Sequence, residues 1–100
     1  MISYFNEQVK SFGVVKEHKT ITITFQATND IPEVVNVSYP CGCNKGSKYD
    51  EATKTLIVVY KSGFLSKQTP FRQSINKQII VTYNNNVQEI ITITGVKIKE

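Results

Sequence analysis

Residues 20 to 28 read Thr-Ile-Thr-Ile-Thr-Phe-Gln-Ala-Thr, and their pattern is the clearest structural signal in the chain. Apolar side chains occupy every second position from Ile21 to Ala27, with polar side chains between them. Successive side chains of a β-strand point to opposite faces of a sheet. This stretch is therefore predicted to be a strand with one face in a core and the other in water.

The same alternation recurs along the chain, between segments predicted to be turns, one of which is Tyr49-Asp50-Glu51. It is weak over residues 9–15 and clear in four later segments, at 33–39, 55–61, 76–83 and 87–99. Six or seven short strands with frequent turns are typical of a sandwich or a small barrel. The alternation also predicts three further sets of side chains that share a face: Val35, Val37 and Tyr39; Leu56, Val58 and Tyr60; Ile79, Val81 and Tyr83.

Two sequence features predict local backbone geometry. The three asparagines at 84–86 indicate a tight hairpin, because Asn tolerates the positive φ that such turns need. Gly95, inside the last strand segment, predicts a bulge or a close approach of backbone.

Composition favours the same fold class. Val, Ile and Thr make up 33 of the 100 residues, whereas Ala and Leu together make up four. Because β-branched side chains favour strands over helices, a helical bundle is excluded. No apolar run approaches the roughly 18 residues that cross a bilayer, and the 40% hydrophobic fraction is too high for a disordered chain. The prediction is one all-β domain over residues 1–100, with no membrane segment.

Six short motifs, in this order and spacing, resemble a bacterial family of small immunoglobulin-like domains related to the major-sperm-protein and PapD-like sandwiches. They are Phe12-Gly13, Thr24-Phe25 leading to Thr28-Asn29, Pro40-Cys41-Gly42-Cys43, Leu56 to Tyr60, Pro70-Phe71 and Ile91 to Gly95. The resemblance implies an immunoglobulin-like β-sandwich of about seven antiparallel strands, with little chemistry of its own. The chain departs from the family at Asn44, where a Thr is usual, and in a longer segment from Gly63 to Lys77.

Cys41 and Cys43 are the residues that would support redox or metal chemistry. Two thiolates can bind a soft metal, but a closed zinc site needs about four ligands, and the single His18 is far away in sequence. We therefore expect reduced thiols at a strand-to-loop corner, no metal and no cofactor. A bacterial immunoglobulin-like protein that handles thiols or metals through this pair stays open as the alternative function.

No enzymatic constellation is visible. A hydrolytic triad would have His18 as its one possible base, and this residue lies in a charged turn between two predicted strands. No glycine-rich segment opens a helix, as a phosphate-binding loop would. The protein is therefore expected not to be an enzyme.

The net charge of +4 is concentrated late in the chain, between Lys61 and Lys77, where no acidic residue occurs. Apolar side chains among these cations are typical of a segment that docks on a protein, with the alternative that they cap the sandwich. The predicted docking residues are Lys61, Phe64, Leu65, Lys67, Phe71, Arg72 and Lys77.

Binding of single-stranded nucleic acid is a further alternative for a small basic β-domain. It requires exposed aromatic side chains on which bases can stack. Phe25, Tyr39 and Tyr60 fall on the apolar faces of their strands, so we expect them in the core and expect no nucleic-acid partner.

These observations favour a non-enzymatic module that docks on another protein. The N-terminus lacks a secretory signal pattern, and the A/T-rich codons of Asn, Lys, Ile and Tyr, 36 residues together, suggest a low-GC genome. By analogy with single immunoglobulin-like domains of tailed phages, we expect an auxiliary or decoration protein on a bacteriophage capsid. It would bind the major capsid or another virion protein in many copies; the bacterial cytoplasm or periplasm is the alternative location. The lysines of Val96 to Lys99 are expected to protect an exposed sheet edge.

Overall fold

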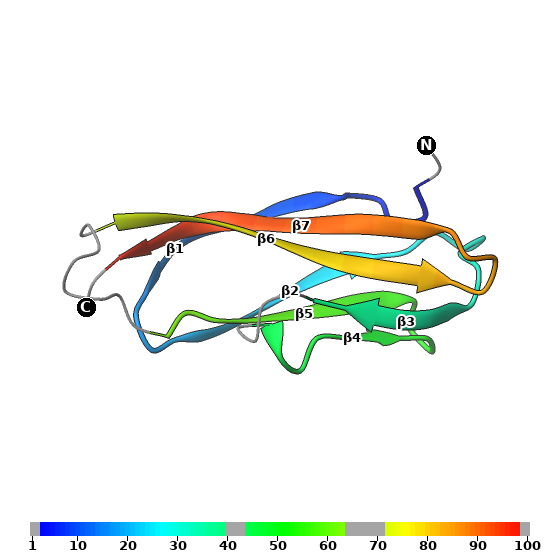
Figure 1. Cartoon of the computed structure of the whole chain (residues 1–100), viewed down its shortest axis with the longest axis horizontal. Helices are drawn as coiled ribbons and strands as arrows, with labels where there is room; N and C mark the ends of the chain where they lie inside the picture. The colour runs from blue at the N-terminus through cyan, green and yellow to red at the C-terminus, as the bar shows by residue number, and fades with distance from the viewer. Residues whose placement is uncertain (1–2, 40–43, 64–71, 99–100) are drawn as a thin grey trace.

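The computed structural model describes residues 3–39, 44–63 and 72–98, which form two β-sheets packed face to face (Figure 1). The sheet orders are β1-β7-β6-β3 and β2-β5-β4. This confirms the expected all-β sandwich of seven strands. The strands are β1 (Val9–Lys16), β2 (Thr20–Gln26), β3 (Val34–Ser38), β4 (Lys48–Asp50), β5 (Thr55–Lys61), β6 (Arg72–Tyr83) and β7 (Gln88–Ile98).

The pairing of β1 differs from the expected antiparallel arrangement. β1 runs parallel to β7, from the Val9–Thr92 pair to the Lys16–Ile98 pair, whereas every other pairing is antiparallel. A tight turn after Lys16 sends the chain into the other sheet, so β1 and β2 do not form a hairpin within one sheet. β1 is therefore free to follow the direction of β7.

The core lies between the sheets and is built from the predicted alternating faces. On β5, Leu56, Val58 and Tyr60 are buried, and they face the buried side chains of β6 and β7. Complete burial of one such side chain contributes about 1.5–3 kcal/mol. The buried apolar set is Phe5, Val15, Phe25, Ala27, Leu56, Val58, Tyr60, Ile75, Ile79, Val81, Tyr83, Ile91 and Ile93.

Gly95 lies opposite an irregularity of β1 and is approached closely by a side chain, not by backbone as predicted. The register between β1 and β7 shifts between Ser11 and Val14, and Gly13 there has a φ of 76°. The ring of Phe12 lies over Gly95 and stacks on Tyr60 at 5.1 Å between centroids. A Cβ added to Gly95 would come within 2.3 Å of the Phe12 ring, so this site has no room for a side chain.

Two details of the strands differ from the sequence prediction. A register shift in β3 between Val34 and Asn36 leaves Val35 56% exposed, and Val34 packs on the core in its place. Val37 and Tyr39 pack on the core as predicted. The second difference is β4, a three-residue strand at a position predicted to be a turn. Three residues are too few to show the alternation of apolar and polar side chains that indicates a strand.

The predicted hairpin at 84–86 is present and joins β6 to β7. Asn86 has a φ of 65°, and the Tyr83 N–H donates to the Val87 carbonyl at 2.9 Å. A three-residue loop that ends in a left-handed residue is a common hairpin geometry.

The last strand is not a sheet edge, which corrects the prediction for Val96 to Lys99. β7 lies between β1 and β6, and the side chain of Lys97 is only 9% exposed. The edges of the sheets are β1, β3, β2 and β4. Within the described residues, no helix is long and apolar enough to cross a membrane.

Candidate functional site: the two charged ends of the sandwich

One end of the sandwich is organised around the buried Ser62, directly after β5. Its hydroxyl donates to the Lys16 carbonyl at 2.7 Å and accepts from the Lys19 N–H at 2.8 Å. The His18 N–H donates to the Gly63 carbonyl at 2.5 Å. These bonds tie the turn between β1 and β2 to the end of β5, so the side chains on this turn project from a rigid base.

Lys97 contributes a buried cation to the same end. Its side chain points inward from β7, and its ammonium group donates to the Ser62 carbonyl at 2.6 Å. The carbonyl supplies an acceptor for a charge that would otherwise be costly to bury.

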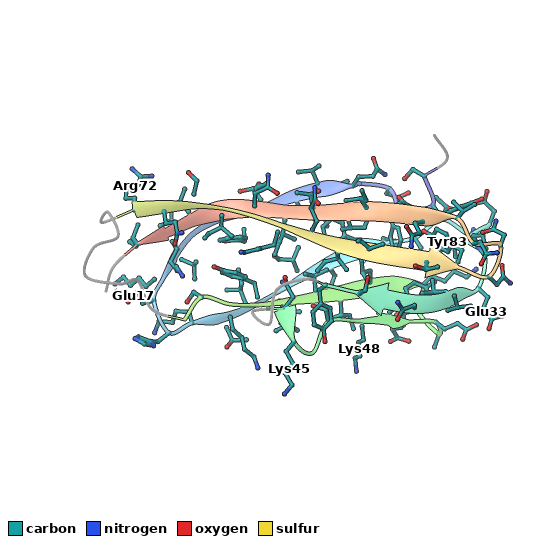
Figure 2. All side chains as sticks on the ribbon, viewed as in Figure 1. Glu17, Glu33, Lys45, Lys48, Arg72 and Tyr83 are labelled. Atoms are coloured by element: carbon teal, nitrogen blue, oxygen red, sulfur yellow. The ribbon has the colours of Figure 1, made fainter. Side chains whose placement is uncertain are left out.

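Four exposed cations surround this end and define what we call the basic end: Lys16, Lys19, Lys61 and Arg72. Lys16 and Lys61 close their strands, Lys19 lies in the turn, and Arg72 opens β6. Figure 2 shows Arg72 at one extreme of the long axis, with Glu17 nearby. The basic end thus includes two of the predicted docking residues, Lys61 and Arg72.

The remaining predicted docking residues are not part of this cluster. Lys77 is half-buried on β6, five residues beyond Arg72, which is about 17 Å along a strand. Phe64, Leu65, Lys67 and Phe71 lie outside the described residues, as do Cys41 and Cys43.

The opposite end carries the reverse charge. Four carboxylates there define the acidic end: Asp30, Glu33, Asp50 and Glu51. Lys54 is the cation on these turns, and its ammonium group donates to the Asn29 carbonyl at 2.9 Å. A hydrogen bond from Thr28 lowers the pKa of Asp30, as does its own backbone N–H, so this carboxyl is charged at neutral pH.

A groove lies beside these carboxylates, between the edge strands β3 and β4. It consists of two adjoining hollows of about 320 and 310 Å³ that share Val34, Tyr49 and Glu51. We call it the edge groove. Its walls combine apolar side chains with the carboxylates of Glu33 and Glu51, and Lys48 and Lys54 also line it. Burial raises the pKa of Tyr49, and the negative charges of Glu51 and Asp50 raise it further, so the phenol stays neutral.

Behind the acidic end, a buried carboxylate closes the core. Glu89 is 5% exposed and accepts hydrogen bonds from the Tyr83 hydroxyl at 2.7 Å, the Ser3 hydroxyl at 2.7 Å and the Tyr4 N–H at 3.0 Å. Burial raises the pKa of Tyr83, and the bond to Glu89 raises it further. This network joins residues 3 and 4 to β6 and β7.

The described side chains form no metal centre. No group of three or more His, Cys, Asp or Glu that could hold a metal ion occurs within residues 3–39, 44–63 and 72–98. His18 is exposed in the turn after β1, with a φ of 60°, as its predicted turn position implies. What this part of the molecule offers is two charged ends and a groove, an arrangement suited to binding.

Comparison with known proteins does not extend this description. No model of a protein family matches the chain, and no curated protein sequence matches it either. The family resemblance therefore still depends on the motifs quoted above.

Sequence reasoning missed the edge groove and the acidic end. Residues 49–51 were predicted to be a turn, so Tyr49 and Glu51 were not expected to line a cavity. The available signal was the polar-apolar-polar order of Lys48, Tyr49 and Asp50, which is too short to separate a strand from a turn. The acidic residues also come from two separate segments, 30–33 and 50–51, and only the topology brings these segments together.

Proposed function

We propose that this protein is a non-enzymatic interaction module that docks on an acidic surface of a partner protein through its basic end. The observation that carries the proposal is the gathering of four exposed cations around a hydrogen-bonded turn. Long-range charge attraction speeds the encounter of complementary surfaces. A rigid base limits the entropy lost when the complex forms.

The biological setting that we propose is a bacteriophage virion, with the protein as an auxiliary or decoration component on the capsid. A small domain that binds in many copies needs a stable fold and a repeated contact, not a catalytic site. This setting rests on the family resemblance and on analogy with other phage domains.

Nucleic acid is a less suitable partner for the basic end. Every aromatic side chain in the described residues is buried or half-buried, including Phe25, Tyr60 and Tyr83. Bases stack on exposed rings, and this stacking provides much of the affinity for single strands. A steep salt dependence of binding to a single-stranded oligonucleotide would contradict the proposal.

Copurification with intact phage particles tests the proposal. The wild-type protein should remain on particles at low salt and dissociate at about 1 M salt, where charges are screened beyond about 3 Å. The variant Lys61→Glu/Arg72→Glu should bind particles at least about tenfold more weakly. The control Lys45→Glu changes an exposed lysine away from both ends and should bind like the wild type (Figure 2). Absence of the protein from purified particles would refute the virion setting.

A further inference from the structure

We propose that copies of this chain associate head to tail, with the basic end of one copy docked on the acidic end and edge groove of the next. The inference rests on the proposed function, because it names a second copy as a partner of the same basic end. It is carried by the charge separation along the molecule and by the chemistry of the groove.

The two charged ends lie at opposite extremes of the long axis. β6 begins at Arg72 and ends at Tyr83, beside Glu33, and the molecule measures 45 × 24 × 19 Å (Figure 2). Charges separated by much more than about 8–10 Å are screened from one another at physiological salt. The basic end and the acidic end therefore cannot neutralise each other within one copy, but they can do so between copies.

The edge groove suits the side chains that the basic end presents. Lysine and arginine combine an aliphatic stem with a cationic head, and the stem packs on apolar surface while the head seeks an anion. Val34 and Tyr49 offer the apolar wall, and Glu33 and Glu51 offer the anions. Two lysines, Lys48 and Lys54, also line the groove, so a docked cation shares its carboxylates with them. The ammonium group of Lys54 donates to the Asn29 carbonyl, and its charge also acts on Asp30.

The same charges select head-to-tail association over a two-fold dimer. A two-fold contact through either end would place like charges opposite one another, which costs free energy. In a head-to-tail pair, one copy keeps an unused acidic end and the other keeps an unused basic end. Association therefore continues to longer chains or closes into a ring.

Sedimentation measurements on the whole chain test the inference. At about 0.01 M salt, where screening extends over about 30 Å, the weight-average mass at about 1 mM protein should rise to at least about twice the 11.3 kDa of the monomer. At about 1 M salt it should return to the monomer value. A monomer under both conditions would overturn the inference.

Two double variants test the surfaces. Glu33→Gln/Glu51→Gln should weaken self-association about tenfold, and so should Lys16→Gln/Lys19→Gln, whereas Lys45→Gln should leave it unchanged. In a mixture of the two double variants, the wild-type basic end of one variant can bind the wild-type acidic end of the other. The mixture should therefore form a one-to-one complex that does not grow with concentration. Urea unfolding is measured first for each variant, and its midpoint must equal that of the wild type. A loss of association then cannot result from a loss of folding.

The same variants distinguish a failure of head-to-tail association from a failure of the proposed function. Glu33→Gln/Glu51→Gln keeps the basic end, so it should still bind phage particles although it no longer self-associates. If the mixture of double variants forms no complex, head-to-tail association is refuted, whatever the particle binding shows. If particles bind none of the proteins while self-association persists, the virion setting fails alone.

Discussion

The core-facing side of β7 carries an acidic side chain near one end of the strand and a basic side chain near the other. The two side chains are stabilised by different hydrogen bonds. Glu89 closes the core at the acidic end and accepts three hydrogen bonds, two of them from residues 3 and 4 at the start of the described chain. Lys97, eight residues later, closes the core at the basic end and donates to the Ser62 carbonyl. Between them lie the fully buried Ile91 and Ile93.

The difference follows from side-chain chemistry. A carboxylate can only accept hydrogen bonds, so burying it requires several donors, and here they come from two distant segments. An ammonium group sits on a long apolar stem, so the stem can pack on the core while the head reaches a backbone carbonyl near the surface. The carboxylate should therefore contribute more to the cooperativity of the fold than the lysine.

Replacing Glu89 should have the largest effect. Glu89→Ala leaves the Tyr83 hydroxyl and the Tyr4 N–H without their acceptor, whereas the Ser3 hydroxyl keeps the Phe5 carbonyl. The change should lower the free energy of unfolding by about 2–4 kcal/mol. Urea unfolding followed by circular dichroism measures the change. Glu7→Ala, at an exposed position, is the control and should cost less than about 0.5 kcal/mol. Equal effects of the two variants would show that the network is not a structural element.

Removing the Ser62 hydroxyl should have the next largest effect, at the basic end. Ser62→Ala deprives the Lys19 N–H of its acceptor, at an expected cost of about 1–3 kcal/mol. The Lys19 amide should also exchange with deuterium faster, because the turn loses its anchor. The control is the exposed Ser74→Ala on β6, which should change neither quantity. An unchanged exchange rate at Lys19 would contradict the role given to Ser62.

Alkaline pH should weaken the fold through its buried tyrosines. Folding raises the pKa of Tyr83 and, by burial, that of Tyr60. Their contribution is therefore complete below the ordinary pKa of about 10 and is lost as the pH rises above it. Each tyrosine that ionises only when unfolded should lower the free energy of unfolding by about 1.4 kcal/mol per pH unit. Tyr83→Phe should make this slope shallower in urea titrations, and an unchanged slope would argue against a protonated Tyr83.

Replacing Lys97 should have the smallest effect. Lys97→Met keeps most of the apolar stem and removes a charge that is buried against a single described carbonyl, so the expected cost is about 1 kcal/mol or less. The exposed Lys45→Met serves as the control in the same urea titration. A loss as large as that of Glu89→Ala would mean that the two ends are equally important for stability.

Much of the fold could be predicted, because a strand that buries only one of its faces shows a strong alternation of apolar and polar side chains. The faces of β2, β5, β6 and β7 followed directly from positions such as Ile23, Val58 and Ile91. The register of β3 could not be predicted, because a bulge at Val35 shifts the alternation by one residue and no local signal marks it. β4 was missed because it has three residues.

The candidate site was less predictable than the fold. Lys61 and Arg72 were identified from the charge of their segment, but Lys16 and Lys19 join them only through the turn that packs on Ser62. Lys97 was expected at an exposed edge because lysine is typical of edges. It is instead buried, because β7 lies between β1 and β6 and the Lys97 side chain reaches the Ser62 carbonyl, an arrangement that no residue pattern indicates.

That parallel pairing has a mechanical consequence. β1 starts near the acidic end, and β7 finishes at the basic end (Figure 1). A pulling force that separates the start of β1 from the end of β7 therefore acts along both strands, and it loads the hydrogen bonds between them together in shear. An antiparallel hairpin pulled from its open end would break its bonds one after another. The sandwich should thus yield abruptly and at high force when it is stretched along its length.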